Sequence, residues 1–125
     1  MPGALLRVFS GGAAHAASRH WVVQRLTAIA LVPLAIWFLV SLLLLPDLGY
    51  ASVHAWVARP LPATLLCLLI EALFWHSRLG VQEVVADYLH TPFMHAAISW
   101  LSTLLHLLAA AAALLAVLRI ALGKA

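Results

Sequence analysis

The chain has 125 residues, of which 66% are hydrophobic and 9% are charged, whereas a soluble domain is nearer half apolar and a quarter charged. This composition indicates an integral membrane protein and leaves no room for a separate catalytic domain. Seven Lys and Arg residues against four acidic ones give a net charge of +3. The basic residues are scattered singly, which argues against nucleic acid as a partner and favours anchors at the ends of membrane spans.

Three long apolar stretches predict an all-α membrane protein with three transmembrane helices. The predicted spans are residues 22–45, 61–86 and 96–122. Each exceeds the roughly 20 residues that cross the hydrocarbon core of a bilayer. Residues 1–20 are mostly polar or small, and we expect them to form a retained N-terminal arm that is partly disordered.

Two connections join the predicted spans, an outer one at residues 46–60 and an inner loop at residues 87–95. In the outer connection, Tyr50, Val53 and Trp56 recur at helical spacing. This spacing predicts a short helix that lies flat at the membrane interface.

The basic residues near the first span predict the orientation. Arg7, Arg19 and Arg25 precede this span or lie at its start, and such residues usually stay on the cytoplasmic side. We therefore expect a bacterial inner-membrane protein with its N-terminus in the cytoplasm and its C-terminus in the periplasm. Three spans then return residues 87–95 to the cytoplasmic side.

Polar residues form a narrow stripe on the second span. At about 100° per residue, the positions that share this face are His76, Gly80, Glu83 and Asp87. A neutral imidazole can ligate haem iron, and a glycine one turn away lets a flat macrocycle lie against the backbone. The residues alone leave another interpretation open, in which His76 is a buried histidine that hydrogen-bonds to a neighbouring helix.

The segment HSRLGVQEVVADYLH, which begins at His76, resembles the His-x3-Gly-x-Gln-x4-Asp-Tyr signature of the D-type membrane-anchor subunits of succinate dehydrogenase, respiratory complex II. The matching residues are His76, Gly80, Gln82, Asp87 and Tyr88. A weaker resemblance, HWVVQRLTAIALVPL from His20 to Leu34, lies where that family places its first membrane helix.

The resemblance implies a haem b site. His76 would be an axial ligand of the iron, and the second ligand would come from the C-type membrane-anchor subunit. Gly80 would pack against the haem. Arg25 would lie near the haem propionates, with His20 as a looser candidate for the same role.

The resemblance also implies a ubiquinone site and a set of partners. Tyr88 would donate a hydrogen bond to a quinone carbonyl, and Asp87 would orient Tyr88 or relay protons. This chain would be a non-catalytic subunit that anchors the iron–sulfur and flavoprotein subunits to the membrane lipid. The complex would pass electrons from succinate to ubiquinone, in the tricarboxylic acid cycle and the aerobic respiratory chain.

Two other functions compete with this interpretation. One is a structural anchor without a cofactor, whose histidines only bond helices together. The other is a small transport subunit in which a proton or solute path is lined by Glu71, His76, Arg78 and His106. His106 lies near the depth of His76, so an internal two-histidine haem site is also conceivable, but a hydrogen-bonded helix contact is our prediction for His106.

Overall fold

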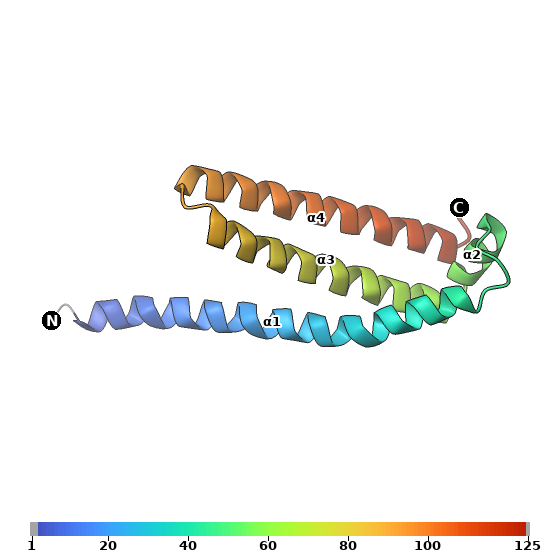
Figure 1. Cartoon of the computed structure of the whole chain (residues 1–125), viewed down its shortest axis with the longest axis horizontal. Helices are drawn as coiled ribbons and strands as arrows, with labels where there is room; N and C mark the ends of the chain where they lie inside the picture. The colour runs from blue at the N-terminus through green and yellow to red at the C-terminus, as the bar shows by residue number, and fades with distance from the viewer. Residues whose placement is uncertain (1–2, 125) are drawn as a thin grey trace.

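The computed structural model describes the backbone of residues 3–124 and the side chains of residues 15–124, and in this part the chain is helical without strands. The helices are α1 (Gly3–Leu43), α2 (Tyr50–Val57), α3 (Pro60–Tyr88) and α4 (Pro92–Ala121), in that order along the chain (Figure 1). Three segments are long and apolar enough to cross a membrane, namely His15–Leu43, Pro60–Tyr88 and Pro92–Ala121. The predicted all-α fold with three spans is therefore confirmed.

The prediction of a partly disordered N-terminal arm is wrong for the residues that the structure describes. α1 begins at Gly3 and continues without a break into the first span. Alanine is the best helix former, and extending an existing helix costs far less than starting a new one. The Ala-rich segment before His20 therefore continues the helix of the span. Residues 1–2 lie outside the described part of the chain.

Prolines define the starts of α3 and α4. Pro60 and Pro92 are the first residues of these helices, where proline is favoured because its missing N–H has no partner in the helix and its φ is already helical. Because α3 extends to Tyr88 and α4 begins at Pro92, the predicted loop at residues 87–95 contracts to residues 89–91. Pro33 lies inside α1, and Figure 1 shows that α1 bends in its C-terminal part.

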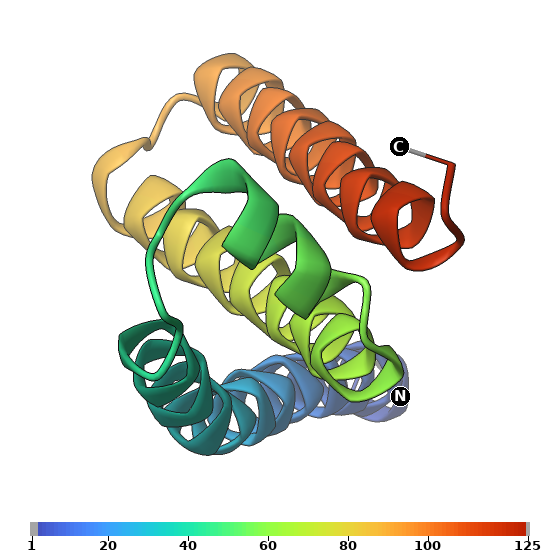
Figure 2. The same cartoon turned by 90° about the vertical axis from the view of Figure 1, so that its right-hand side faces the viewer.

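α3 is the central helix of the bundle. Both α1 and α4 pack along it, and within the described residues they do not pair with each other. Figure 2 shows this open arrangement from one end, with α2 lying across the end of α3. Many large apolar side chains on the outer faces of the helices are exposed. Helices of this length with such exposure need a bilayer or neighbouring subunits to cover them.

The most buried part of the molecule lies beneath α2. Trp56 and Val57 of α2 pack with Ala63 and Leu66 of α3 and with Val117 of α4. The Trp56 ring also stacks on Trp37 of α1, with 5.8 Å between the ring centroids. The predicted short helix is thus confirmed, but part of its apolar side covers the end of the bundle. Its location at the membrane interface stays a prediction.

A tight turn leads into α2. The Asp47 carboxylate accepts hydrogen bonds from the Gly49 N–H at 2.7 Å and from the Ser52 hydroxyl at 2.8 Å. A Cβ on Gly49 would lie 2.6 Å from Asp47 Oδ1. Glycine at position 49 therefore permits the close approach that ties the loop to the first turn of α2.

Candidate functional site

Polar side chains from α1 and α3 meet at the contact between these two helices. On α1 they are His20, Gln24 and Thr27, which follow one another at intervals of four and three residues and so share one face of the helix. On α3 they are His76 and Glu83, two turns apart. Two members of the polar stripe predicted for the second span, His76 and Glu83, therefore contact α1.

His76 is half-buried and bonded to α1. Its Nδ1 atom lies 3.0 Å from the Thr27 hydroxyl oxygen. In the part of the chain that the structure describes, the other ring nitrogen, Nε2, has no hydrogen-bond partner. His76 therefore makes the interhelical bond foreseen by the structural interpretation, and it still has a nitrogen available for a ligand bond.

Gly80 lies one turn from His76 and leaves open space beside the helix. A Cβ built at this position would meet no atom within 4 Å, apart from its chain neighbours and the backbone of its own helix. Packing inside this chain therefore does not explain the glycine. The space beside it can accept part of another molecule.

The Glu83 carboxylate is shared by two side chains of α1. Gln24 Nε2 donates to Glu83 Oε2 at 3.2 Å, and His20 Nδ1 lies 3.7 Å from Glu83 Oε1. His20, which the resemblance connects weakly with haem propionates, is thus paired with a carboxylate of its own chain. Gln24 and Thr27 were not predicted as members of this contact, although their spacing from His20 places all three residues on one face of a helix.

Arg25 points away from the contact between α1 and α3. It is exposed, and its guanidinium carbon lies 5.1 Å from the centroid of the Trp21 ring. Within the described residues it forms no ion pair. The structure does not bring Arg25 to His76, and its charge is available to a molecule outside this chain.

Asp87 and Tyr88 form the end of α3. Both are exposed, Tyr88 to 78%, and neither makes a side-chain hydrogen bond within the described residues. Because α3 is continuous from His76 to Tyr88, these two residues are about 18 Å apart along its axis. Figure 1 shows this end of α3 on the same side of the bundle as the N-terminal part of α1.

His106 of α4 uses both of its ring nitrogens. Its Nδ1 lies 2.7 Å from the Ser102 carbonyl oxygen, and its Nε2 lies 3.1 Å from the Ser77 hydroxyl. Because the carbonyl can only accept, Nδ1 carries the proton and Nε2 accepts from Ser77. In this geometry His106 has no free lone pair for iron. The predicted helix contact is confirmed, and the internal two-histidine site is not formed.

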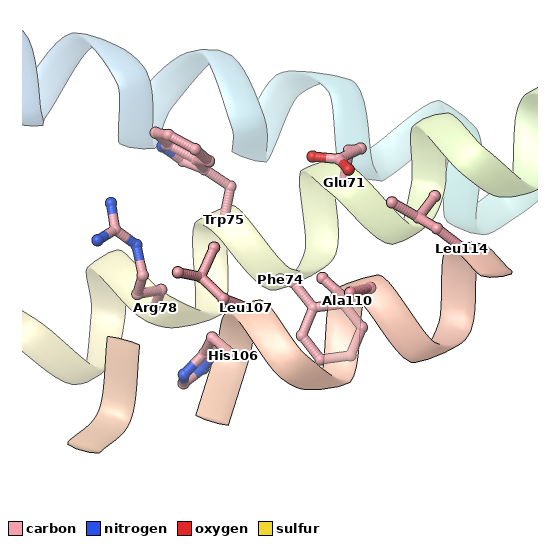
Figure 3. A pocket seen from close by; sticks show the side chains of 9 residues that line it. Glu71, Phe74, Trp75, Arg78, His106, Leu107, Ala110 and Leu114 are labelled. Carbon is pink, nitrogen blue, oxygen red and sulfur yellow. The ribbon is translucent and has the colours of Figure 1, made fainter. Parts of the chain in front are cut away.

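A cavity of about 230 Å³ lies between α3 and α4. Figure 3 shows its lining, with Glu71 and Arg78 on α3 and His106 on α4. The Arg78 guanidinium carbon lies 5.0 Å from the centroid of the Trp75 ring. Glu71 and Arg78 are seven residues apart in α3, about 10 Å along the helix axis, and they form no ion pair with each other. His76 faces α1 instead, so the four residues of the transport hypothesis do not line one cavity.

In the part of the chain that the structure describes, no three His, Cys, Asp or Glu side chains cluster to hold a metal ion.

Sequence comparisons agree with the geometry of the three spans. The profile of the succinate dehydrogenase/fumarate reductase transmembrane subunit family matches residues 3–119. The chain belongs to this family. The match covers α1, α2, α3 and nearly all of α4, so membership applies to the whole bundle.

Individual relatives name the kind of subunit. A succinate dehydrogenase hydrophobic membrane anchor subunit of Rickettsia bellii (strain RML369-C) is 29% identical over 85 residues, which are 68% of each chain. A subunit of the same name from Coxiella burnetii (strain RSA 493 / Nine Mile phase I) is 28% identical over 87 residues, which are 70% of this chain and 76% of the relative. The family match, together with three candidate spans in this chain, identifies it as a multi-pass bacterial membrane-anchor subunit of the succinate dehydrogenase kind.

Proposed function

We propose that this anchor subunit binds haem b through His76 and forms part of the site where ubiquinone is reduced by electrons from succinate. The haem proposal rests on the hydrogen bonding of the two ring nitrogens of His76. One ring nitrogen is held by Thr27 at 3.0 Å, and the other has no partner among the described residues. A histidine that ligates a metal through one nitrogen usually hydrogen-bonds through the other.

The surroundings of His76 fit a haem. Gly80 offers open space one turn away, where a macrocycle can lie against the backbone. Arg25 lies away from His76, but it is exposed and unpaired within the described residues, and its guanidinium suits the propionate carboxylates of a haem that extends beyond this chain. His20 remains a weaker candidate for that role because it lies beside Glu83. When bound, haem b supplies one-electron redox chemistry, while these residues hold and orient it.

The second axial ligand is proposed to come from the C-type membrane-anchor subunit. Within this chain, His106 is already engaged through both ring nitrogens, which supports a ligand from another chain. The iron–sulfur and flavoprotein subunits would dock on the side that carries Asp87 and Tyr88. The basic residues near the first span support a cytoplasmic location for that side and for the N-terminus, with the C-terminus in the periplasm.

Two variants test the haem proposal. His76→Leu removes the proposed ligand, whereas His106→Leu removes a histidine of the same bundle that only bonds helices. In the purified complex, we expect His76→Leu to abolish or change the low-spin b-type band in the reduced-minus-oxidised spectrum, and His106→Leu to retain it. Equal haem loss in both variants would contradict the assignment, and so would unchanged haem in both.

The ubiquinone proposal concerns Tyr88 and Asp87. Tyr88 is 78% exposed, and its hydroxyl has no partner among the described residues. A phenol O–H can donate to a quinone oxygen on which negative charge grows during reduction. Asp87 precedes it on the last turn of α3, where its carboxylate can orient the phenol or relay protons.

The matching test is Tyr88→Phe, which keeps the ring and removes one hydroxyl. A charge-assisted hydrogen bond is worth roughly 1–3 kcal/mol, so succinate–ubiquinone activity should fall by about 5- to 150-fold. Succinate oxidation with an artificial acceptor that takes electrons from the soluble subunits should stay nearly unchanged, as should haem content. A parallel loss of both activities would instead identify Tyr88 as an interfacial anchor, and no loss in either would remove it from the quinone site.

A further inference from the structure

The Thr27 hydroxyl lies at the centre of three polar contacts. Its oxygen is 2.9 Å from the Val23 carbonyl oxygen and 3.0 Å from the Gln24 carbonyl oxygen, both one turn earlier in α1. The third neighbour is His76 Nδ1 of α3, at 3.0 Å. Of these three, only the histidine can either donate or accept.

The single hydroxyl proton settles the direction of these bonds. Both carbonyl oxygens can only accept, so a Thr27 proton directed at His76 would leave the hydroxyl oxygen facing two carbonyl oxygens with no hydrogen between them. With the proton shared between the two carbonyls of α1 in a three-centre bond, the hydroxyl oxygen accepts from an Nδ1–H of His76. Each of the three contacts then has a hydrogen. This arrangement assigns the neutral His76 ring to the tautomer with hydrogen on Nδ1 and a lone pair on Nε2.

We propose that Thr27 is a positioning residue for His76, which fixes the ring tautomer and orientation so that Nε2 is presented to haem iron. This inference rests on the proposed haem function. It gives Thr27 of the first span a role in orienting His76, the proposed iron ligand on the second span. In the described residues, His76 has no other side-chain hydrogen bond that could fix its tautomer.

The hydrogen bond between Thr27 and His76 should also affect the reduction potential of the haem iron. A hydrogen bond donated by the far nitrogen makes imidazole a more basic ligand. A more basic ligand stabilises the ferric form and lowers the reduction potential. Loss of the Thr27 hydroxyl should therefore weaken haem binding and raise the midpoint potential of the haem that remains.

The chain offers a matched set of variants. Thr27→Val keeps the shape and removes the hydroxyl, while Thr27→Ser restores a hydroxyl on a smaller side chain. Thr64→Val is the control, because the Thr64 hydroxyl also bonds to a carbonyl one turn earlier, Pro60 at 2.8 Å, but does so at an exposed position of α3. The readouts are haem content per complex, the low-spin absorbance spectrum and a reductive titration.

In Thr27→Val we expect haem affinity to fall by about tenfold or more, which is the usual effect of removing such a partner, and the midpoint potential to rise. Thr27→Ser and Thr64→Val should resemble the unsubstituted complex. Equal loss in Thr27→Val and Thr27→Ser would mean that Thr27 acts by packing, and this would overturn the inference. Unchanged affinity and potential in Thr27→Val would also overturn it.

His76→Leu separates this inference from the function on which it rests. If His76→Leu loses the low-spin haem while Thr27→Val does not, the haem proposal stands and the role of Thr27 fails. If His76→Leu retains the haem, the haem proposal fails.

If Thr27→Val does not fold, a measurement on the chain with Thr27 unchanged still tests the inference. In the full chain labelled with ¹⁵N-histidine, reconstituted in lipid without haem, the ring signals that disappear in His76→Leu should show a protonated Nδ1 and an unprotonated Nε2. A proton on Nε2 would overturn the inference.

Discussion

Replacement of Gly80 by alanine should have opposite effects on the chain alone and on its haem affinity. In the chain, a Cβ at this position meets no atom within 4 Å beyond its chain neighbours and its own helix backbone. The substitution therefore has no steric cost there. Alanine is about 1 kcal/mol more favourable than glycine inside a helix, so the chain should become slightly more stable to unfolding.

If a haem packs against Gly80, the added methyl group would clash with it. Adding carbon atoms to a closely packed contact typically costs roughly 1–3 kcal/mol. With RT near 0.59 kcal/mol, that cost corresponds to haem affinity lower by about 5- to 150-fold. Gly80→Leu adds four carbons and should resemble His76→Leu in haem content.

The assay compares two quantities in the same variants, the haem-to-protein ratio of the purified complex and the unfolding midpoint of the chain in detergent. Ala109→Leu, at an exposed position of α4, controls for adding a leucine to a membrane helix. Full haem with an unshifted spectrum in both Gly80 variants would refute the haem-packing role. A clear loss of chain stability in Gly80→Ala would refute the conclusion that the space beside it is open.

Two further predictions concern stability. Trp56→Ala should lower the free energy of unfolding by roughly 3–5 kcal/mol, because Trp56 is only 7% exposed and stacks on Trp37. Thermal unfolding in detergent measures this loss. A loss below about 1 kcal/mol would show that packing of α2 does not stabilise the bundle. Glu83→Gln should change the stability of the chain by less than about 1 kcal/mol, because the Glu83 side chain is 51% exposed and glutamine can still accept from Gln24. A larger loss in the assembled complex than in the chain would indicate that a neighbouring subunit buries Glu83.

The number of spans and the shared face of His76 and Gly80 could be predicted from the sequence. An apolar run that can cross a bilayer must satisfy its backbone hydrogen bonds internally, so length and composition alone determine a helix. The same helix period places His76 and Gly80 on one face. The motif that begins at His76 was sufficient to indicate the family that the comparisons confirm.

Other features depend on contacts that periodicity does not encode. The partly disordered arm was predicted because residues 1–20 lack a long apolar run, but a helix that already exists in the span extends back to Gly3. Likewise, the spacing in residues 46–60 predicted the short helix, but only packing decides that Trp56 covers the end of the bundle.

The tertiary structure also decides which partner each polar side chain has. The sequence places His76 and His106 at similar depths in two spans, but it does not say which face of α3 each neighbouring helix covers. With α3 in the centre, His76 meets Thr27 of α1, while His106 of α4 meets Ser77. A hydrogen bond requires its two atoms to come within about 3 Å, and only the packing of the helices brings residues 49 and 29 positions apart to that distance.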